Sequence, residues 1–87
     1  LINLSLLYLK NNDYNMALKQ LESSIELCKI EKQFINLSIC YIRKGVCLSN
    51  MGTCGLYWIN KGMSMLEVLD QFDLLSILKA EIKQYST

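Results

Sequence analysis

The chain contains 87 residues, of which nine are basic and eight are acidic, so its formal net charge is +1. Because the two signs are mixed along the chain, the basic stripe of a nucleic-acid-binding segment is absent. No apolar run reaches the roughly 18–20 residues that a membrane-spanning helix needs, and the opening apolar run lacks the basic region of a secretory leader. We therefore expect neither DNA contact nor membrane insertion by this segment.

The apolar content is high for so small a chain. Hydrophobic residues make up 52% of the sequence, whereas a domain of this size buries only roughly 60–65% of its unfolded surface. The excess predicts burial against further parts of the same protein or against a second copy. The chain also begins at Leu1 with no capping residue ahead of its first helical pattern. We expect residues 1–87 to form a single helical domain, a fragment from the C-terminal side of a longer protein.

Apolar residues recur at helical spacing almost throughout, and proline is absent. This pattern predicts an all-α chain of about five helices. The expected helices span about residues 1–11, 14–30, 34–50, 55–69 and 74–85. Asn12 or Asp13 would cap the second helix and Asp73 the last one, while Gly52 would end the third helix in a left-handed conformation.

The third and last expected helices differ in character. Residues 34–50 are apolar on more than one side, which is typical of a buried helix. Residues 74–85 have one apolar and one polar face, as expected of the helix that closes a helical array.

The second and fourth helical segments resemble one another. When the second is laid over the fourth, Ala17 falls on Gly55 and Leu21 on Ile59, so small residues align with small ones and large with large. Laying the first segment over the third places Ser5 on Gly45, although these two segments match less well. Both shifts lie near the period of tetratricopeptide and related helical-hairpin arrays. Chance similarity between amphipathic helices is the alternative.

The four cysteines are Cys28, Cys40, Cys47 and Cys54, and the chain has no histidine. No Cys-x-x-Cys pair is present, so we expect neither a metal site nor a cofactor. Free cysteines pack as small apolar residues, which is our interpretation here. A disulfide framework is the less favoured alternative, because the apolar content is too high for a stapled miniprotein.

Several segments carry a resemblance to known families. The pattern from Leu4 to Ser24 resembles a tetratricopeptide consensus, without its leading Trp. The wider layout resembles the C-terminal end of the Rgg/GadR/MutR family of bacterial transcriptional regulators. Its segments are Asn3-Leu4, Leu7-Tyr8-Leu9, Asp13 to Leu18, Arg43-Lys44-Gly45, Trp58 to Gly62 and Leu66 to Phe72. The resemblance covers essentially the whole chain, and it rests on the order and spacing of these segments.

This resemblance implies a cytoplasmic regulator that contacts DNA through an N-terminal helix-turn-helix domain, which this chain lacks. The C-terminal helical repeats would form a homodimer and sense a short, often hydrophobic, signalling peptide on a concave face, as in quorum sensing. The alternative is a generic tetratricopeptide-type scaffold for protein–protein interaction, unrelated to transcription.

In a helical-hairpin array, the first helix of each hairpin lines the concave surface. Asn36, Cys40, Arg43, Cys47 and Asn50 share one face of the third helix. Asn side chains can clamp a peptide backbone, and Arg can hold a carboxylate with two parallel bonds. The expected ligand-binding residues are therefore Asn3, Asn36, Arg43 and Asn50. Ordinary surface charges and solvated amides are the alternative.

The fourth helix carries candidate interface residues, namely Trp58, Met63 and Met65. Aromatic residues and Met are enriched in interface cores, although core packing explains such residues equally well. Acidic residues are scattered over outward faces with no His partner, so no arrangement for general acid–base catalysis is present. We therefore expect a protein that is not an enzyme.

Overall fold

The computed structural model describes residues 2–85, and its side chains from residue 4 onward. The described part contains five helices and no strand, which confirms the predicted all-α class. The helices are α1 (Ile2–Lys10), α2 (Tyr14–Glu31), α3 (Phe34–Asn50), α4 (Leu56–Val68) and α5 (Phe72–Tyr85). The observed ends lie close to the predicted ones. None of the helices within residues 2–85 is long and apolar enough to cross a membrane.

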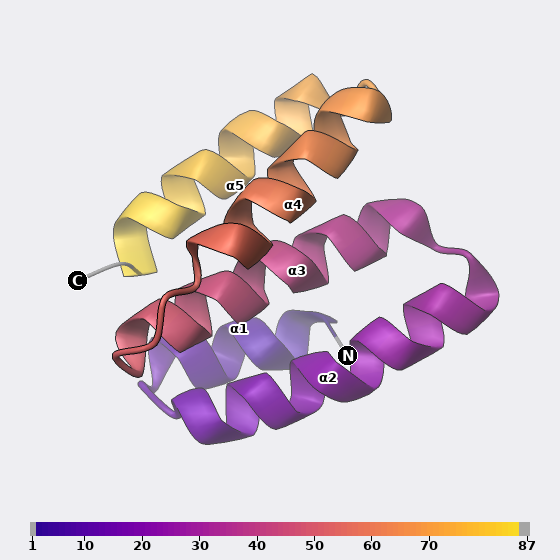
Figure 1. The fold of residues 1–87 in the computed structure, drawn as a ribbon. Helices are drawn as coiled ribbons and strands as arrows, with labels where there is room; N and C mark the ends of the chain where they lie inside the picture. Colours follow the sequence, from indigo (N-terminus) through magenta and orange to yellow (C-terminus); the bar gives the residue numbers. More distant parts are fainter. Residues whose placement is uncertain (1, 86–87) are drawn as a thin grey trace.

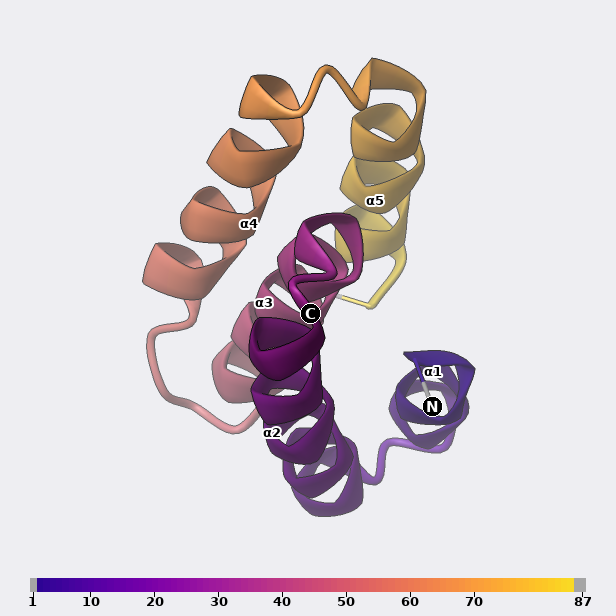
Figure 2. The same cartoon turned by 90° about the vertical axis from the view of Figure 1, so that its right-hand side faces the viewer.

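Helix α3 lies at the centre of the molecule and packs against the other four helices. In Figure 1, α3 runs between the α1–α2 pair and the α4–α5 pair. Figure 2 shows α4 on one side of α3, with α1 and α5 on the other side. The prediction that residues 34–50 form a buried helix is confirmed, since nine of its residues are buried.

The four connections between helices share one local geometry. A residue with positive φ ends each of the first four helices: Asn12, Lys32, Gly52 and Asp70. Each of these residues donates its N–H to the carbonyl three residues earlier, and the next residue donates to the carbonyl five residues earlier. This is the Schellman arrangement, which satisfies the last carbonyls of a helix. The connections are spaced almost evenly along the chain, in keeping with the internal similarity seen in the sequence.

Two of the predicted helix ends are confirmed and one is wrong. Asp13 caps α2 by accepting a hydrogen bond from the Met16 N–H, and Gly52 follows α3 with a φ of 84°. Asp73, however, lies inside the first turn of α5. The carbonyl of Gln71 already accepts the N–H of Leu75, so the helix begins earlier than predicted. There the Asp73 carboxylate lies near the positive end of the helix dipole.

Glycines allow α3 and α4 to approach closely. A Cβ on Gly55 would collide with the backbone of Gly45, and a Cβ on Gly62 would lie 2.5 Å from the Ser38 carbonyl oxygen. In the first hairpin, the aligned small residues Ser5 and Ala17 are fully buried. Small residues therefore occupy buried positions in both hairpins.

Two groups of apolar side chains form the core. The larger group joins α2 and α3 with parts of α1 and α4. The smaller one comprises Ile42, Leu66, Leu75 and Leu78, and it fixes α5 to α3 and α4. The apolar face predicted for the last helix is thus buried, whereas the repeat array itself stays a prediction.

We expect Gly55→Ala to destabilise the protein more than Gly52→Ala. The new methyl group at residue 55 meets backbone that cannot move aside, and such overpacking costs about 1–3 kcal/mol. At residue 52 no atom lies within 4 Å of a Cβ, so only the strain of positive φ remains, about 1 kcal/mol. Urea unfolding followed by circular dichroism would measure both. Equal losses would contradict the close approach of α3 and α4.

Candidate functional site

The face of α3 that carries the predicted ligand-binding residues is closed along its middle. Cys40 and Cys47 are fully buried, and Arg43 is buried as well. The side chain of Asn3 lies outside the described residues, so its position stays a prediction. The middle of this α3 face is therefore not open to a ligand.

Arg43 binds a carboxylate, but the carboxylate belongs to α5 of the same chain. Its Nε donates to Oε2 of Glu81 at 3.0 Å, and its Nη2 donates to Oε1 at 3.0 Å. The two side chains are only 8% and 13% exposed. The alternative that Arg43 is an ordinary surface charge is wrong. The two parallel bonds expected of its guanidinium are present, and they hold α5 against α3.

The two predicted amides have different roles. Asn50 donates from Nδ2 to the carbonyl oxygen of Tyr85 at 2.7 Å, so it holds the last turn of α5. Asn36 donates to Oε1 of Gln33 at 3.0 Å, near the start of α3. Asn50 and Arg43 therefore act on the same helix, whereas Asn36 lies apart from them.

Residues of α1 and α5 line a groove. Figure 2 shows these two helices to one side of α3, with α4 on the other side. The groove encloses about 270 Å³ and is lined by Leu6, Lys10, Ile77, Ala80, Glu81, Gln84 and Tyr85. The lining mixes apolar side chains with an amide and a phenol. The Glu81 charge is neutralised by Arg43, while Lys10 forms no ion pair within the described residues. We call this surface the α1–α5 groove.

The three predicted interface residues of α4 are largely covered within the chain. The Trp58 ring lies 5.4 Å from the Tyr41 ring, centroid to centroid, and the Lys44 ammonium lies 3.9 Å from the centre of the Trp58 ring. Met63 is half-buried against both core groups. Met65 is half-buried too, but it also lines a second, apolar cavity on the α4 side of the molecule.

Three of the four cysteines are buried and Cys54 is exposed, all as free thiols. Burial, together with the neighbouring Cys28, raises the pKa of Cys40 from 9.0 to about 12. Burial alone raises the pKa of Cys47 from 9.0 to about 11. Both thiols are therefore protonated at neutral pH, which makes them poor nucleophiles. The interpretation of the cysteines as small buried residues holds for all but Cys54.

Sequence reasoning missed the groups that complete this site. Glu81 follows Leu74 and Leu78 at helical spacing and precedes Tyr85 by one helical turn, so it lies on the inward stripe of α5. A carboxylate on an apolar stripe indicates a buried partner of opposite charge, so the sequence contained a signal for the role of Glu81. The sequence did offer Leu6 or Leu7 with Lys10 as a candidate face of the first helix, and Leu6 and Lys10 line the groove. No comparable signal marked Ile77, because an apolar residue on an amphipathic helix is ordinarily part of the core.

Comparison of the chain with models of known protein families, with curated proteins and with solved structures gave no match. The function must therefore be argued from the geometry of the molecule itself.

Replacing Glu81 with Gln should destabilise the fold by about 3–5 kcal/mol, because it leaves the Arg43 charge buried without its counter-ion. The double replacement Arg43→Met with Glu81→Met should recover most of this loss, since two apolar side chains can fill the space. Urea unfolding of the three proteins would measure the difference. Equal stability of Glu81→Gln and the unmodified protein would contradict a buried ion pair.

One thiol for each chain should react rapidly with an alkylating agent at neutral pH, and it should be Cys54. The other three thiols should react only after addition of denaturant, because burial shields them and keeps Cys40 and Cys47 protonated. Mass spectrometry of timed samples would count the labels. The variant Cys54→Ser should show no rapid labelling, and rapid labelling of a second thiol would be inconsistent with the packing.

Proposed function

We propose that this chain is a tetratricopeptide-like helical-hairpin module that binds a short peptide in the α1–α5 groove. One observation carries the proposal: α1 and α5 flank an open groove with mixed lining, while the Arg43–Glu81 pair holds α5 in place. In this proposal Arg43 and Asn50 position α5, and side chains of α1 and α5 contact the peptide.

The chemistry of the groove suits a largely hydrophobic peptide. Leu6, Ile77 and Ala80 offer apolar contact, and Gln84 can donate to and accept from a peptide backbone. The Lys10 ammonium at the end of α1 would attract the free carboxylate of a peptide C-terminus. Ile77 is 62% exposed, so a ligand would cover apolar surface that is now in water.

We further propose that the chain is the regulatory and dimerisation segment of an Rgg/GadR/MutR-type transcriptional regulator of the bacterial cytoplasm. Support comes from the order of the sequence segments and from the five-helix layout. A homodimer would form through apolar side chains that the chain leaves exposed, such as Leu4 and Leu7 of α1. Translation of the DNA upstream of the Leu1 codon tests this: a helix-turn-helix pattern supports it, and no such pattern would favour a scaffold.

Peptide binding should depend on Ile77. Short synthetic peptides rich in Leu, Ile and Phe, with a free C-terminus, would be titrated against the protein by fluorescence anisotropy. We expect binding by a subset of peptides, weakened about tenfold or more by Ile77→Glu, which corresponds to about 1.4 kcal/mol. Amidation of the peptide C-terminus should also weaken binding, because Lys10 loses its partner.

The matched control is Leu56→Glu, an exposed apolar residue at the first position of α4 and outside the groove. This variant should bind the peptides as the unmodified protein does. The proposal fails when no peptide binds, or when Ile77→Glu and Leu56→Glu have equal effects.

A further inference from the structure

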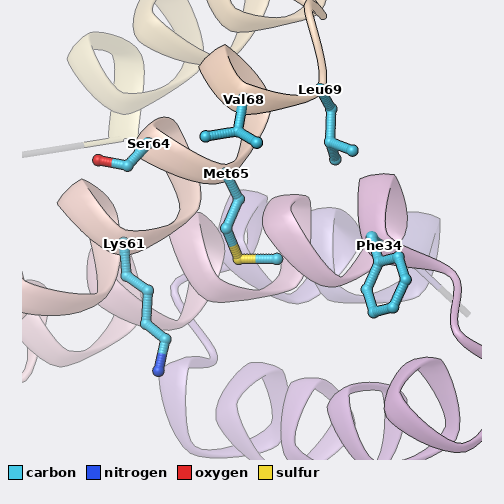
Figure 3. Close-up of a pocket in the computed structure, with 6 residues that line it drawn as sticks. All are labelled: Phe34, Lys61, Ser64, Met65, Val68 and Leu69. Carbon is cyan, nitrogen blue, oxygen red and sulfur yellow. The ribbon is translucent and has the colours of Figure 1, made fainter.

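An apolar groove lies on the α4 side of the molecule, away from the α1–α5 groove. One of its two cavities encloses about 380 Å³ and is lined by Phe34, Lys61, Ser64, Met65, Val68 and Leu69. Figure 3 shows these side chains along α4 and at the start of α3. A second cavity of about 500 Å³ shares Phe34 and Leu69 and extends over the α2–α3 connection. We call the surface lined by these two adjoining cavities the α4 groove.

The α4 groove is open to solvent, and its apolar side chains are exposed at Phe34, Ile35 and Val68 and half-buried at Met65 and Leu69. Val68 is 81% exposed and Phe34 is 49% exposed. Sites for small ligands ordinarily bury most of the ligand surface, which an open depression of this kind does not do. An open apolar groove between helices is instead the shape that receives the apolar ridge of a partner helix.

The ionisable residues that line the groove have a single sign. Its two ionisable lining residues are Lys61 and Lys32, and no acidic residue lines either cavity. Neither lysine forms an ion pair within the described residues. The Lys61 ammonium lies 5.0 Å from the ring centre of Tyr41, 5.6 Å from that of Tyr57 and 5.3 Å from that of Trp58.

The aromatic rings position the Lys61 ammonium without neutralising it. Cation–π attraction restrains the side chain, while a full positive charge remains beside the apolar surface. A partner that covers this surface must offer a negative charge near Lys61, because burying an unpaired ammonium is unfavourable. Like charges on the partner would be rejected for the same reason.

We propose that the α4 groove docks an amphipathic helix of a partner protein. The partner helix inserts apolar side chains, spaced one helical turn apart, between Phe34, Met65 and Val68. Acidic residues at the edge of its apolar stripe pair with Lys61 and Lys32. This site is independent of the α1–α5 groove, so one chain can hold a peptide and a partner helix together.

The test selects binders from a library of random peptides of about 16 residues, long enough for roughly four helical turns. Selected peptides should combine a helical apolar stripe with Asp or Glu beside it. Val68→Glu and Lys61→Glu should each weaken their binding about tenfold or more, and binding should weaken as salt is raised. A selected peptide with Glu changed to Lys should lose binding to the unmodified protein and regain part of it with Lys61→Glu.

The matched control is Ile77→Glu, which also replaces an exposed apolar residue with Glu but lies in the α1–α5 groove. It should leave binding of the selected peptides unchanged, while Val68→Glu should leave unchanged the binding of hydrophobic peptides to the α1–α5 groove. Failure at one groove is thereby distinguished from failure at the other. Circular dichroism verifies that the variants are folded, which the exposure of Val68 leads us to expect.

Four results would overturn the inference. Selected peptides without acidic residues, or peptides insensitive to Val68→Glu, would show that the groove does not recognise this chemistry. Displacement of the peptides by dodecanoate would assign the groove to small amphipathic anions. Sedimentation that shows self-association of the unmodified protein and its loss in Val68→Glu would assign the groove to a second copy of the chain.

Discussion

The close approach of α3 and α4 is the constraint on which the rest of the fold depends. Because Gly45, Gly55 and Gly62 carry no side chain, the two helices come closer than any Cβ would permit. This brings one stripe of α4 into the interior, with Ile59 and Leu66 buried. The opposite stripe, which includes Lys61 and Val68, then faces outward beside the start of α3. The α4 groove is thus a direct consequence of glycine contacts on the other side of the helix.

The second constraint is the Arg43–Glu81 pair, which holds α5 against α3. The apolar contacts of Leu75 and Leu78 secure α5 against α3 and α4, whereas the ion pair and the Asn50 bond act nearer its C-terminal end. That end of α5 is the part that lines the groove with α1. A buried ion pair contributes little net stability, so its value here is positional: it holds the part of α5 that lines the α1–α5 groove.

Much of the fold could be predicted because the signals are local. Helical periodicity, the Asp13 cap and the left-handed Gly52 each depend on a few neighbouring residues. Lys32 and Asp70 adopt the same left-handed conformation, but their residue types alone do not predict it. The candidate site was harder, since Arg43 and Glu81 lie far apart in the sequence. Whether the α3 face is open depends on where α5 packs, and no local pattern contains that information.

This geometry explains the high apolar content of the chain. Some of the apolar side chains fill the two core groups. Val68, Ile77 and Phe34 remain exposed to water, because they lie on the helix stripes that the glycine contacts and the ion pair turn outward. Their neighbours differ in charge: the α1–α5 groove contains Lys10 and a carboxylate that Arg43 neutralises, whereas both ionisable residues that line the α4 groove are lysines. Both grooves therefore present positive charge beside apolar surface, so each disfavours a ligand that places a like charge there. In our two proposals, the same frame presents two separate apolar surfaces without requiring any change of shape.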